Sequence, residues 1–138
     1  MLNLTEHRPG NHHAIRSAEP THLVIDDQTY TTSIILGARF LDPDWPVQTL
    51  DDLNEDTVAP LLAPEPEVVL LGAGERPRMP SAKVQHLFLR QGVGLECMSL
   101  VAAARTFNVL MSENRRALAG LILPADDLTP STTNLDTP

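Results

Sequence analysis

The chain has 138 residues, which suits a single domain with one hydrophobic core. Its hydrophobic content of 42% is typical of a folded protein, but aromatic residues make up only 4%, so aliphatic side chains must fill the core. The formal net charge of −8 argues against a general nucleic-acid-binding protein, because contacts with phosphates need a positive surface.

The charge is unevenly distributed along the chain. Residues 1–75 hold three basic and thirteen acidic side chains, whereas residues 76–116 hold seven basic and two acidic ones. The cationic stretch is often only the solvated surface of two helices. It could also form a surface that attracts an anion or an acidic partner.

The single cysteine, Cys97, cannot form an internal disulfide, which fits a reducing compartment. The N-terminus lacks the pattern of a signal peptide. No apolar stretch approaches the roughly 20 residues that span a membrane. These features predict a soluble, cytoplasmic protein without a transmembrane segment.

The first part of the chain predicts a flexible arm followed by β structure. Residues 1–20 are polar and contain Pro9-Gly10, so we expect them to be a flexible N-terminal arm. The strands expected at 22–26 and 29–36 form a hairpin, and residues 39–41 resume the pairing. Trp45, the only tryptophan, is expected to anchor the following bend on the core.

The middle of the chain predicts a β–α–β unit. Asn54 should cap a short helix that ends at Leu62, and the apolar run at 67–71 reads as a central strand. After a glycine loop, Ser81 should cap a helix that runs to Gln91. A strand at 93–98 then completes a parallel crossover unit.

The last part of the chain predicts one more helix and one more strand. The helix runs from Ser99 to Ser112, and the strand covers 116–123. Residues 124–138 are polar and rich in Thr and Asp, so we expect a disordered tail. The fold class is therefore α/β: a three-layer single domain at 21–123, with a mixed sheet, a β–α–β unit and an N-terminal β-hairpin portion.

Parallel strands end at the same edge of a sheet, and ligands often bind there. At this edge we expect residues from the ends of both parallel strands. Glu96, Cys97 and Ser99 lie at the end of the second strand. The residues after the first strand are Gly72, Gly74, Glu75 and Arg76. We also predict that Arg105 or Asn108, on the helix that begins at this edge, reaches the loop at residues 72–76 by hydrogen bonding. The simpler alternative is a solvated helix face, with Glu75 and Arg76 as a loop ion pair.

The known catalytic and cofactor motifs are absent. Gly-Ala-Gly at 72–74 lacks the third glycine of a dinucleotide-binding loop, and no Walker pattern follows it. The neighbouring His12 and His13 have no third metal ligand nearby, and Cys97 has no evident histidine partner. We therefore expect no cofactor and no metal, and we do not expect an enzyme.

Two motifs resemble those of a family of small α/β domains. They are Val-Val-Leu-Leu-Gly-Ala-Gly-Glu-Arg at 68–76 and Arg-Thr-Phe-Asn-Val-Leu at 105–110, with Trp-Pro-Val at 45–47 as further support. The family includes the mitochondrial respiratory complex I assembly factor 3 and an adipogenesis-associated domain protein. The motif residues Arg105, Thr106 and Asn108 join the loop as candidate binding residues.

The resemblance implies a three-layer α/β fold, no established enzymatic activity and a role through protein contacts. The lead interpretation is a non-enzymatic partner-binding or assembly module that is a monomer or a weak homo-oligomer. The alternative is a protein, whether or not an enzyme, that binds a small molecule or an anion at the glycine-loop edge, residues 72–76.

Overall fold

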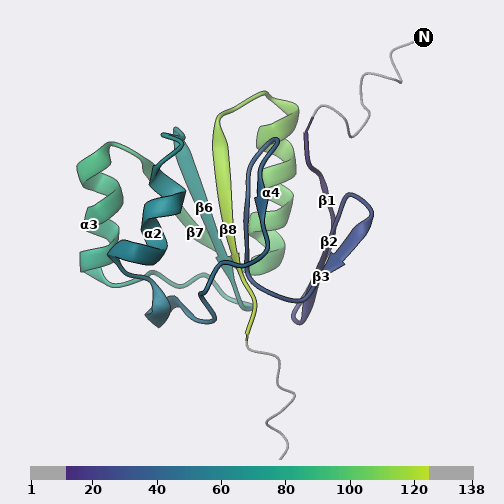
Figure 1. The fold of residues 1–138 in the computed structure, drawn as a ribbon, viewed down its shortest axis with the longest axis horizontal. Coiled ribbons are helices and arrows are strands. Elements are labelled where there is room, and N and C mark those ends of the chain that lie inside the picture. Colours follow the sequence, from purple (N-terminus) through teal and green to yellow (C-terminus); the bar gives the residue numbers. More distant parts are fainter. Residues whose placement is uncertain (1–11, 125–138) are drawn as a thin grey trace, which may run out of the picture.

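A mixed five-stranded sheet forms the centre of residues 12–124, which are the residues that the computed structural model describes (Figure 1). Its strands lie in the order β5-β4-β8-β6-β7. β6 is parallel to both β7 and β8, whereas β4 is antiparallel to β8 and β5. The strand bounds are Ile34–Leu36 for β4, Leu41–Asp42 for β5, Val68–Ala73 for β6, Gly94–Met98 for β7 and Ala117–Ile122 for β8.

β6 is the central strand that the apolar run predicts. Its side chains alternate between the faces, so that Leu70 packs on one side and both Val69 and Leu71 pack on the other. All three are buried, which explains why the run is continuously apolar. The prediction that β6, β7 and β8 share one sheet, with β6 and β7 parallel, is confirmed.

Helices cover both faces of this sheet (Figure 1). α2, Glu55–Leu62, and α3, Ala82–Gln91, lie on one face, and α4, Leu100–Ser112, lies on the other. The predicted caps are present: the side chains of Asn54, Ser81 and Ser99 each accept a hydrogen bond from a backbone N–H in the first turn. The predicted α/β class with helices on both sides of a mixed sheet is confirmed.

A short 3-10 helix, η2 (Leu50–Asp52), precedes α2 on the α2–α3 face. Trp45 packs on that face as expected, with only 3% of its surface exposed, and its Nε1–H donates to the Thr57 carbonyl at 2.9 Å.

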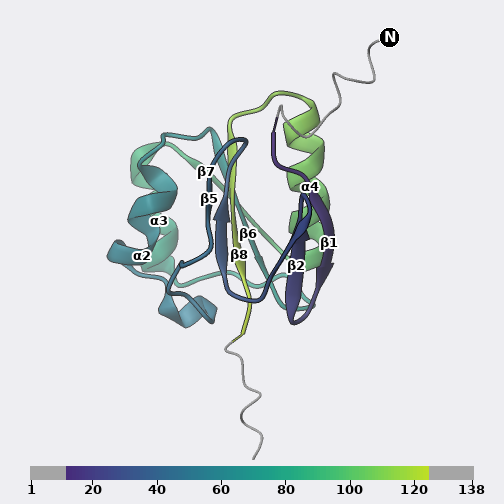
Figure 2. The ribbon, with the colours of Figure 1, turned by 45° about the vertical axis from the view of Figure 1, so that its right-hand side comes forward.

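A second, three-stranded antiparallel sheet lies beside α4 (Figure 2). It consists of β1, Ile15–Glu19, β2, His22–Ile25, and β3, Gln28–Tyr30. The expectation of a flexible arm over residues 1–20 is wrong for β1, because Ile15 is buried in the core beside α4. The other part of that arm, residues 1–11, and residues 125–138 of the expected tail lie outside the described residues.

The β2–β3 hairpin is confirmed, but the single strand expected at 29–36 is wrong. The chain leaves the small sheet after Tyr30 and enters the large sheet as β4. The buried Ser33 hydroxyl fixes the crossing, because it donates to the Leu123 carbonyl at 3.2 Å and accepts from the Leu123 N–H at 2.8 Å. Within the described residues, no helix has the length and apolar character needed to cross a bilayer.

Candidate functional site

The glycine loop after β6 lies at the carboxyl edge of the parallel strands, as predicted. Gly72 is extended and lets α4 approach closely, because a Cβ there would lie 2.5 Å from the Cβ of Ala103. Gly74 instead adopts a positive φ of 64°, which glycine tolerates best. The Gly74 carbonyl accepts a hydrogen bond of 2.9 Å from the N–H of Leu100, so the loop is attached to the start of α4.

Two hollows flank this loop. One, of about 450 Å³, is lined by Gly74, Glu75, Arg76 and Arg78 together with Leu50 of η2. The other, of about 400 Å³, is lined by Gly74 and Glu75 together with Ser99, Leu100 and Val101 at the start of α4. The structure therefore brings part of the predicted site together, because Gly74 and Glu75 line both hollows. Among the described residues, no ion pair joins Glu75 and Arg76.

The three predicted residues of α4 do not reach this loop. The Asn108 amide instead pairs with β1: its Oδ1 accepts from the Ile15 N–H at 2.9 Å, and its Nδ2 donates to the Ile15 carbonyl at 2.8 Å. Thr106 Oγ1 lies 3.5 Å from the Met98 sulfur, and Arg105 is exposed. The predicted hydrogen bond from Arg105 or Asn108 to the loop is therefore wrong. Asn108 follows the start of α4 by about 12 Å along the helix axis, at 1.5 Å per residue, so it meets β1 instead.

Cys97 lies on β7 and is half-buried. Burial raises the pKa of its thiol, and the nearby Glu96 carboxylate raises it further. A thiol with a raised pKa holds less of the reactive thiolate at neutral pH. Within residues 12–124, no three His, Cys, Asp or Glu side chains come together as a candidate metal site.

A surface beside β7 escaped the sequence reasoning. β7 is the last strand of its sheet and pairs only with β6, so its outer edge is unpaired within the described residues. Between β7 and α3 lies a groove of about 480 Å³, whose lining includes Met79, Phe88, Leu89 and Leu95. Leu89 is 74% exposed and Met79 is 58% exposed. We call β7 together with this groove the β7 surface.

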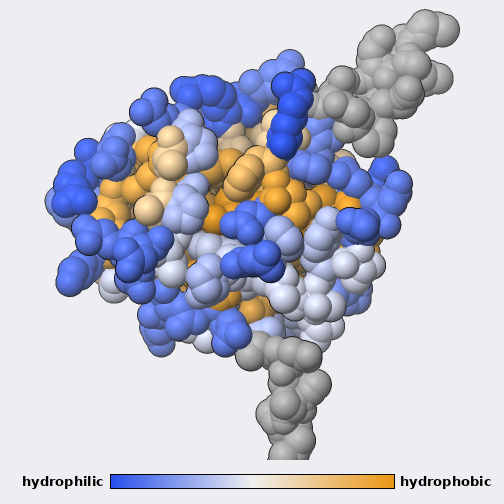
Figure 3. Space-filling view, in the orientation of Figure 1, coloured by the Kyte–Doolittle hydropathy of each residue, from blue (hydrophilic) through white to orange (hydrophobic). Residues whose placement is uncertain are grey.

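Hydrophobic residues reach the molecular surface between hydrophilic ones on the side where α2 and α3 lie (Figure 3). The sequence contained one indication of the β7 surface. Leu89 is an apolar residue outside the Val84, Leu87 and Phe88 stripe of α3, so it is not needed for the core.

A family model described as "Protein of unknown function (DUF498/DUF598)" matches residues 15–122. Among curated proteins, the human NADH dehydrogenase [ubiquinone] 1 alpha subcomplex assembly factor 3 is 30% identical over 113 residues, with 74% of this chain and 61% of the relative covered. The Drosophila melanogaster protein of the same name is 31% identical over 84 residues, with 58% of this chain and 43% of the relative covered. The chain thus spans about half the length of these relatives. A Francisella tularensis relative, 26% identical over 87 residues, is named a 13 kDa major membrane protein; 62% of this chain and 71% of that relative are covered.

Solved structures of bacterial proteins share the fold. A Xanthomonas campestris protein is 39% identical, with a TM-score of 0.75 over 88% of this chain and 92% of the other. A protein from Bordetella parapertussis is 29% identical, with a TM-score of 0.72 over 83% of this chain and 97% of the other. The three-layer α/β fold inferred from the motifs is therefore the fold of these relatives.

Proposed function

The chain belongs to the family of proteins of unknown function DUF498/DUF598, and because its relatives include proteins named as assembly factors, we propose that it is a non-enzymatic module that binds a protein partner. The proposed binding site is the β7 surface. The partner contributes an extended, acidic segment that pairs with the outer edge of β7 and places apolar side chains in the groove. The cytoplasm is the expected location.

The outer edge of β7, which has no partner strand within residues 12–124, is the observation that carries this proposal. An edge strand presents N–H and C=O groups that can pair with another strand, and proteins usually protect such edges. Addition of a strand to an open edge is a common mode of peptide recognition, in which main-chain hydrogen bonds supply affinity and adjacent pockets supply specificity. β7 is five residues long, and the groove with the exposed Leu89 lies directly beside it.

Charge supports an acidic partner segment. The exposed side chains of Arg78, Lys83 and Arg90 lie before and on α3, which forms one wall of the groove. They belong to the cationic stretch at 76–116, whereas the whole chain has a net charge of −8. Opposite charges on the partner would accelerate the encounter and fix the register of the added strand.

The test is affinity capture from the native cell with the wild-type chain and two variants. Leu89→Glu places a charge in the groove. Val109→Glu places the same charge at an exposed apolar residue on α4, away from the groove. We expect Leu89→Glu to weaken capture at least about ten-fold, because an apolar anchor is replaced by a charge, and Val109→Glu to leave it unchanged. Both variants should melt close to the wild type, because both positions are exposed.

Hydrogen exchange on the captured complex provides a second readout. The amides of residues 94–98 should exchange more slowly in the complex than in the free chain, because the added strand would cover them. Equal capture by both variants, or unchanged exchange at 94–98 in the complex, would contradict the proposal.

The alternative function, binding of a small molecule or an anion at residues 72–76, has one observation in its favour. Arg76 and Arg78 both line the 450 Å³ hollow beside the glycine loop. A thermal-shift screen of metabolites, repeated on Arg76→Glu, separates the two functions. A metabolite that raises Tm in the wild type but not in Arg76→Glu would favour the alternative.

A further inference from the structure

A third hollow, of about 340 Å³, lies at the opposite end of the sheet, where the parallel strands begin. Segments far apart in the sequence form its walls: the turn between β4 and β5, the connection from α2 to β6, and the connection from α4 to β8. Its lining includes the buried side chains of Pro66, Met111 and Leu118. The base of this hollow is therefore apolar.

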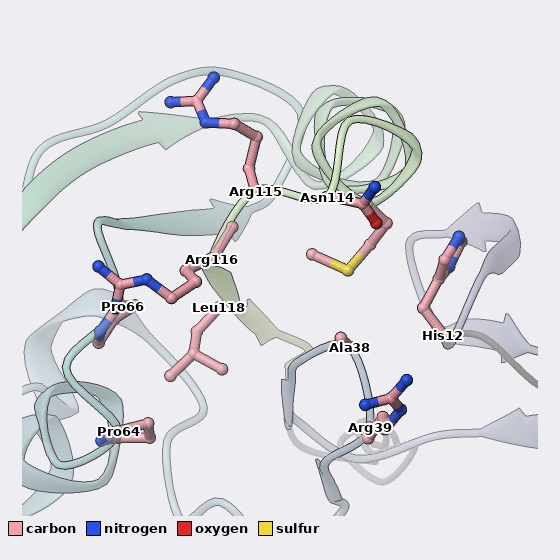
Figure 4. A pocket seen from close by; sticks show the side chains of 11 residues that line it. His12, Ala38, Arg39, Pro64, Pro66, Asn114, Arg115, Arg116 and Leu118 are labelled. Atoms are coloured by element: carbon pink, nitrogen blue, oxygen red, sulfur yellow. The ribbon is translucent and has the colours of Figure 1, made fainter.

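The rim of this hollow is cationic. Arg39 and His12 lie on one side of it and Arg116 lies on the other, with Leu118 between them (Figure 4). Among the residues that the structure describes, no aspartate or glutamate lines the hollow. An apolar base with a cationic rim suits a molecule that has one anionic group and an apolar part.

The three arginines that line the hollow differ in how closely an acidic group approaches them. The Arg115 guanidinium pairs with the Glu67 carboxylate, with 3.0 Å between Nε and Oε1, so its charge is already matched. Arg116 donates from Nη1 to the backbone carbonyl of Glu65 at 2.7 Å, which orients the guanidinium, and its charge also helps to lower the pKa of the Glu67 carboxyl. Among residues 12–124, the Arg39 side chain has neither a hydrogen-bond nor an ion-pair partner.

The carboxyl end of α4 does not strongly repel an anion that binds in this hollow. The carboxyl end of a helix normally presents free carbonyl groups, which repel negative charge. In this chain the carbonyls of Val109, Leu110 and Met111 all accept backbone N–H groups from residues 113–115. Asn114, with a φ of 57°, turns the chain back at this point and itself lines the hollow.

We propose that this hollow binds a small organic anion, a carboxylate or phosphate that carries a short apolar group. The anionic group is held by Arg39, and the apolar group packs against Met111 and Leu118. The site lies at the end of the sheet opposite residues 72–76 and is separate from the β7 surface. Its occupancy therefore does not depend on whether the proposed partner binds.

The test is an NMR titration of the full chain with hexanoate, inorganic phosphate and 1-hexanol. Hexanoate should bind saturably and shift the methyl signals of Met111 and Leu118, whereas phosphate lacks the apolar part and hexanol lacks the charge, so both should bind at least about five-fold more weakly. Arg39→Gln should weaken hexanoate binding about five-fold, since exposed charge contacts are individually modest. High salt should weaken it further.

Two matched arginine variants complete the test. Arg90→Gln, on α3, and Arg76→Gln, at the glycine loop, should leave hexanoate binding unchanged. The proposal is overturned if hexanoate does not bind saturably, or if hexanol or phosphate binds as tightly. It is also overturned if Arg76→Gln weakens hexanoate binding while Arg39→Gln does not.

Discussion

The two faces of the five-stranded sheet are covered in different ways. On one face, α4 packs on β6 and β8 and also contacts β1, so it is held by two sheets. On the other face, the shorter helices α2 and α3 share the surface with Trp45 and η2. Both helices have exposed residues on their outer sides, but α4 buries five of its residues and α3 only two. We infer that the α4 face has less freedom to adjust, and that equal changes should cost more there.

The largest expected effect concerns two buried phenylalanines, one on each face. Phe107 on α4 is 0% exposed and Phe88 on α3 is 1% exposed. Truncation of a buried phenylalanine costs about 3–5 kcal/mol, and the cost rises when the surroundings cannot collapse. We expect Phe107→Ala to cost about 4 kcal/mol and Phe88→Ala about 3 kcal/mol in urea unfolding. A larger loss for Phe88→Ala would contradict the inferred difference between the faces.

A pair of glycines on neighbouring strands sharpens the comparison. A Cβ on Gly72 would lie 2.5 Å from the Ala103 Cβ, which the α4 backbone fixes in place. A Cβ on Gly120 would lie 2.8 Å from the Trp45 ring, on the other face. We expect Gly72→Ala to lower the unfolding free energy by about 2 kcal/mol and Gly120→Ala by about 1 kcal/mol. Chemical denaturation of both variants measures the difference, and equal losses would show that α4 can move aside.

On each face, one side chain attaches a loop or strand through hydrogen bonds. Asn108→Ala removes two hydrogen bonds and leaves the Ile15 N–H and carbonyl without those partners, so we expect a loss of about 1.5 kcal/mol. Trp45→Phe removes the bond to the Thr57 carbonyl, for which we expect about 1 kcal/mol, and it also shortens a buried side chain. Hydrogen exchange should become faster at residues 15–19 in Asn108→Ala but not in Trp45→Phe. Unchanged exchange at 15–19 would mean that β1 does not depend on Asn108.

The smallest effect concerns Cys97, whose side chain packs on the α2–α3 face. Burial raises the pKa of this thiol, so most of it stays protonated at pH 8. We expect iodoacetamide to alkylate Cys97 several-fold more slowly in the folded chain than in the chain unfolded by urea. Equal rates in the two states would show that burial does not control the reactivity of this thiol.

The sequence predicted the elements whose determinants are local. The caps at Asn54, Ser81 and Ser99 and the continuous apolar run of β6 are read from neighbouring residues, and each is found in the structure. β1 was not predicted, because only Ile15 within it is buried and the remaining residues are polar or small. Ile15 of β1 forms hydrogen bonds with Asn108, which no local pattern could connect with it.

The candidate sites could likewise be predicted only where consecutive residues of the chain form them. The edge at Gly74 and Glu75 could be predicted, because strand, loop and helix are consecutive in the chain. The β7 surface required knowledge that β7 is the last strand of its sheet, which depends on the order of all five strands. The hollow between Arg39 and Arg116 could not be predicted, because the segments that form it are brought together only by the complete fold.

The bond between Asn108 and Ile15 also has a consequence for synthesis of the chain. The two residues are 93 positions apart, so the first strand of the domain leaves the ribosome long before its partner on α4 exists. β1, β2 and β3 can pair with one another early, because their connections are short, but a small sheet of short strands has little stability of its own. We therefore expect Ile15, Leu23 and Ile25 to complete their burial only after α4 emerges, and exposed apolar surface during that interval favours aggregation.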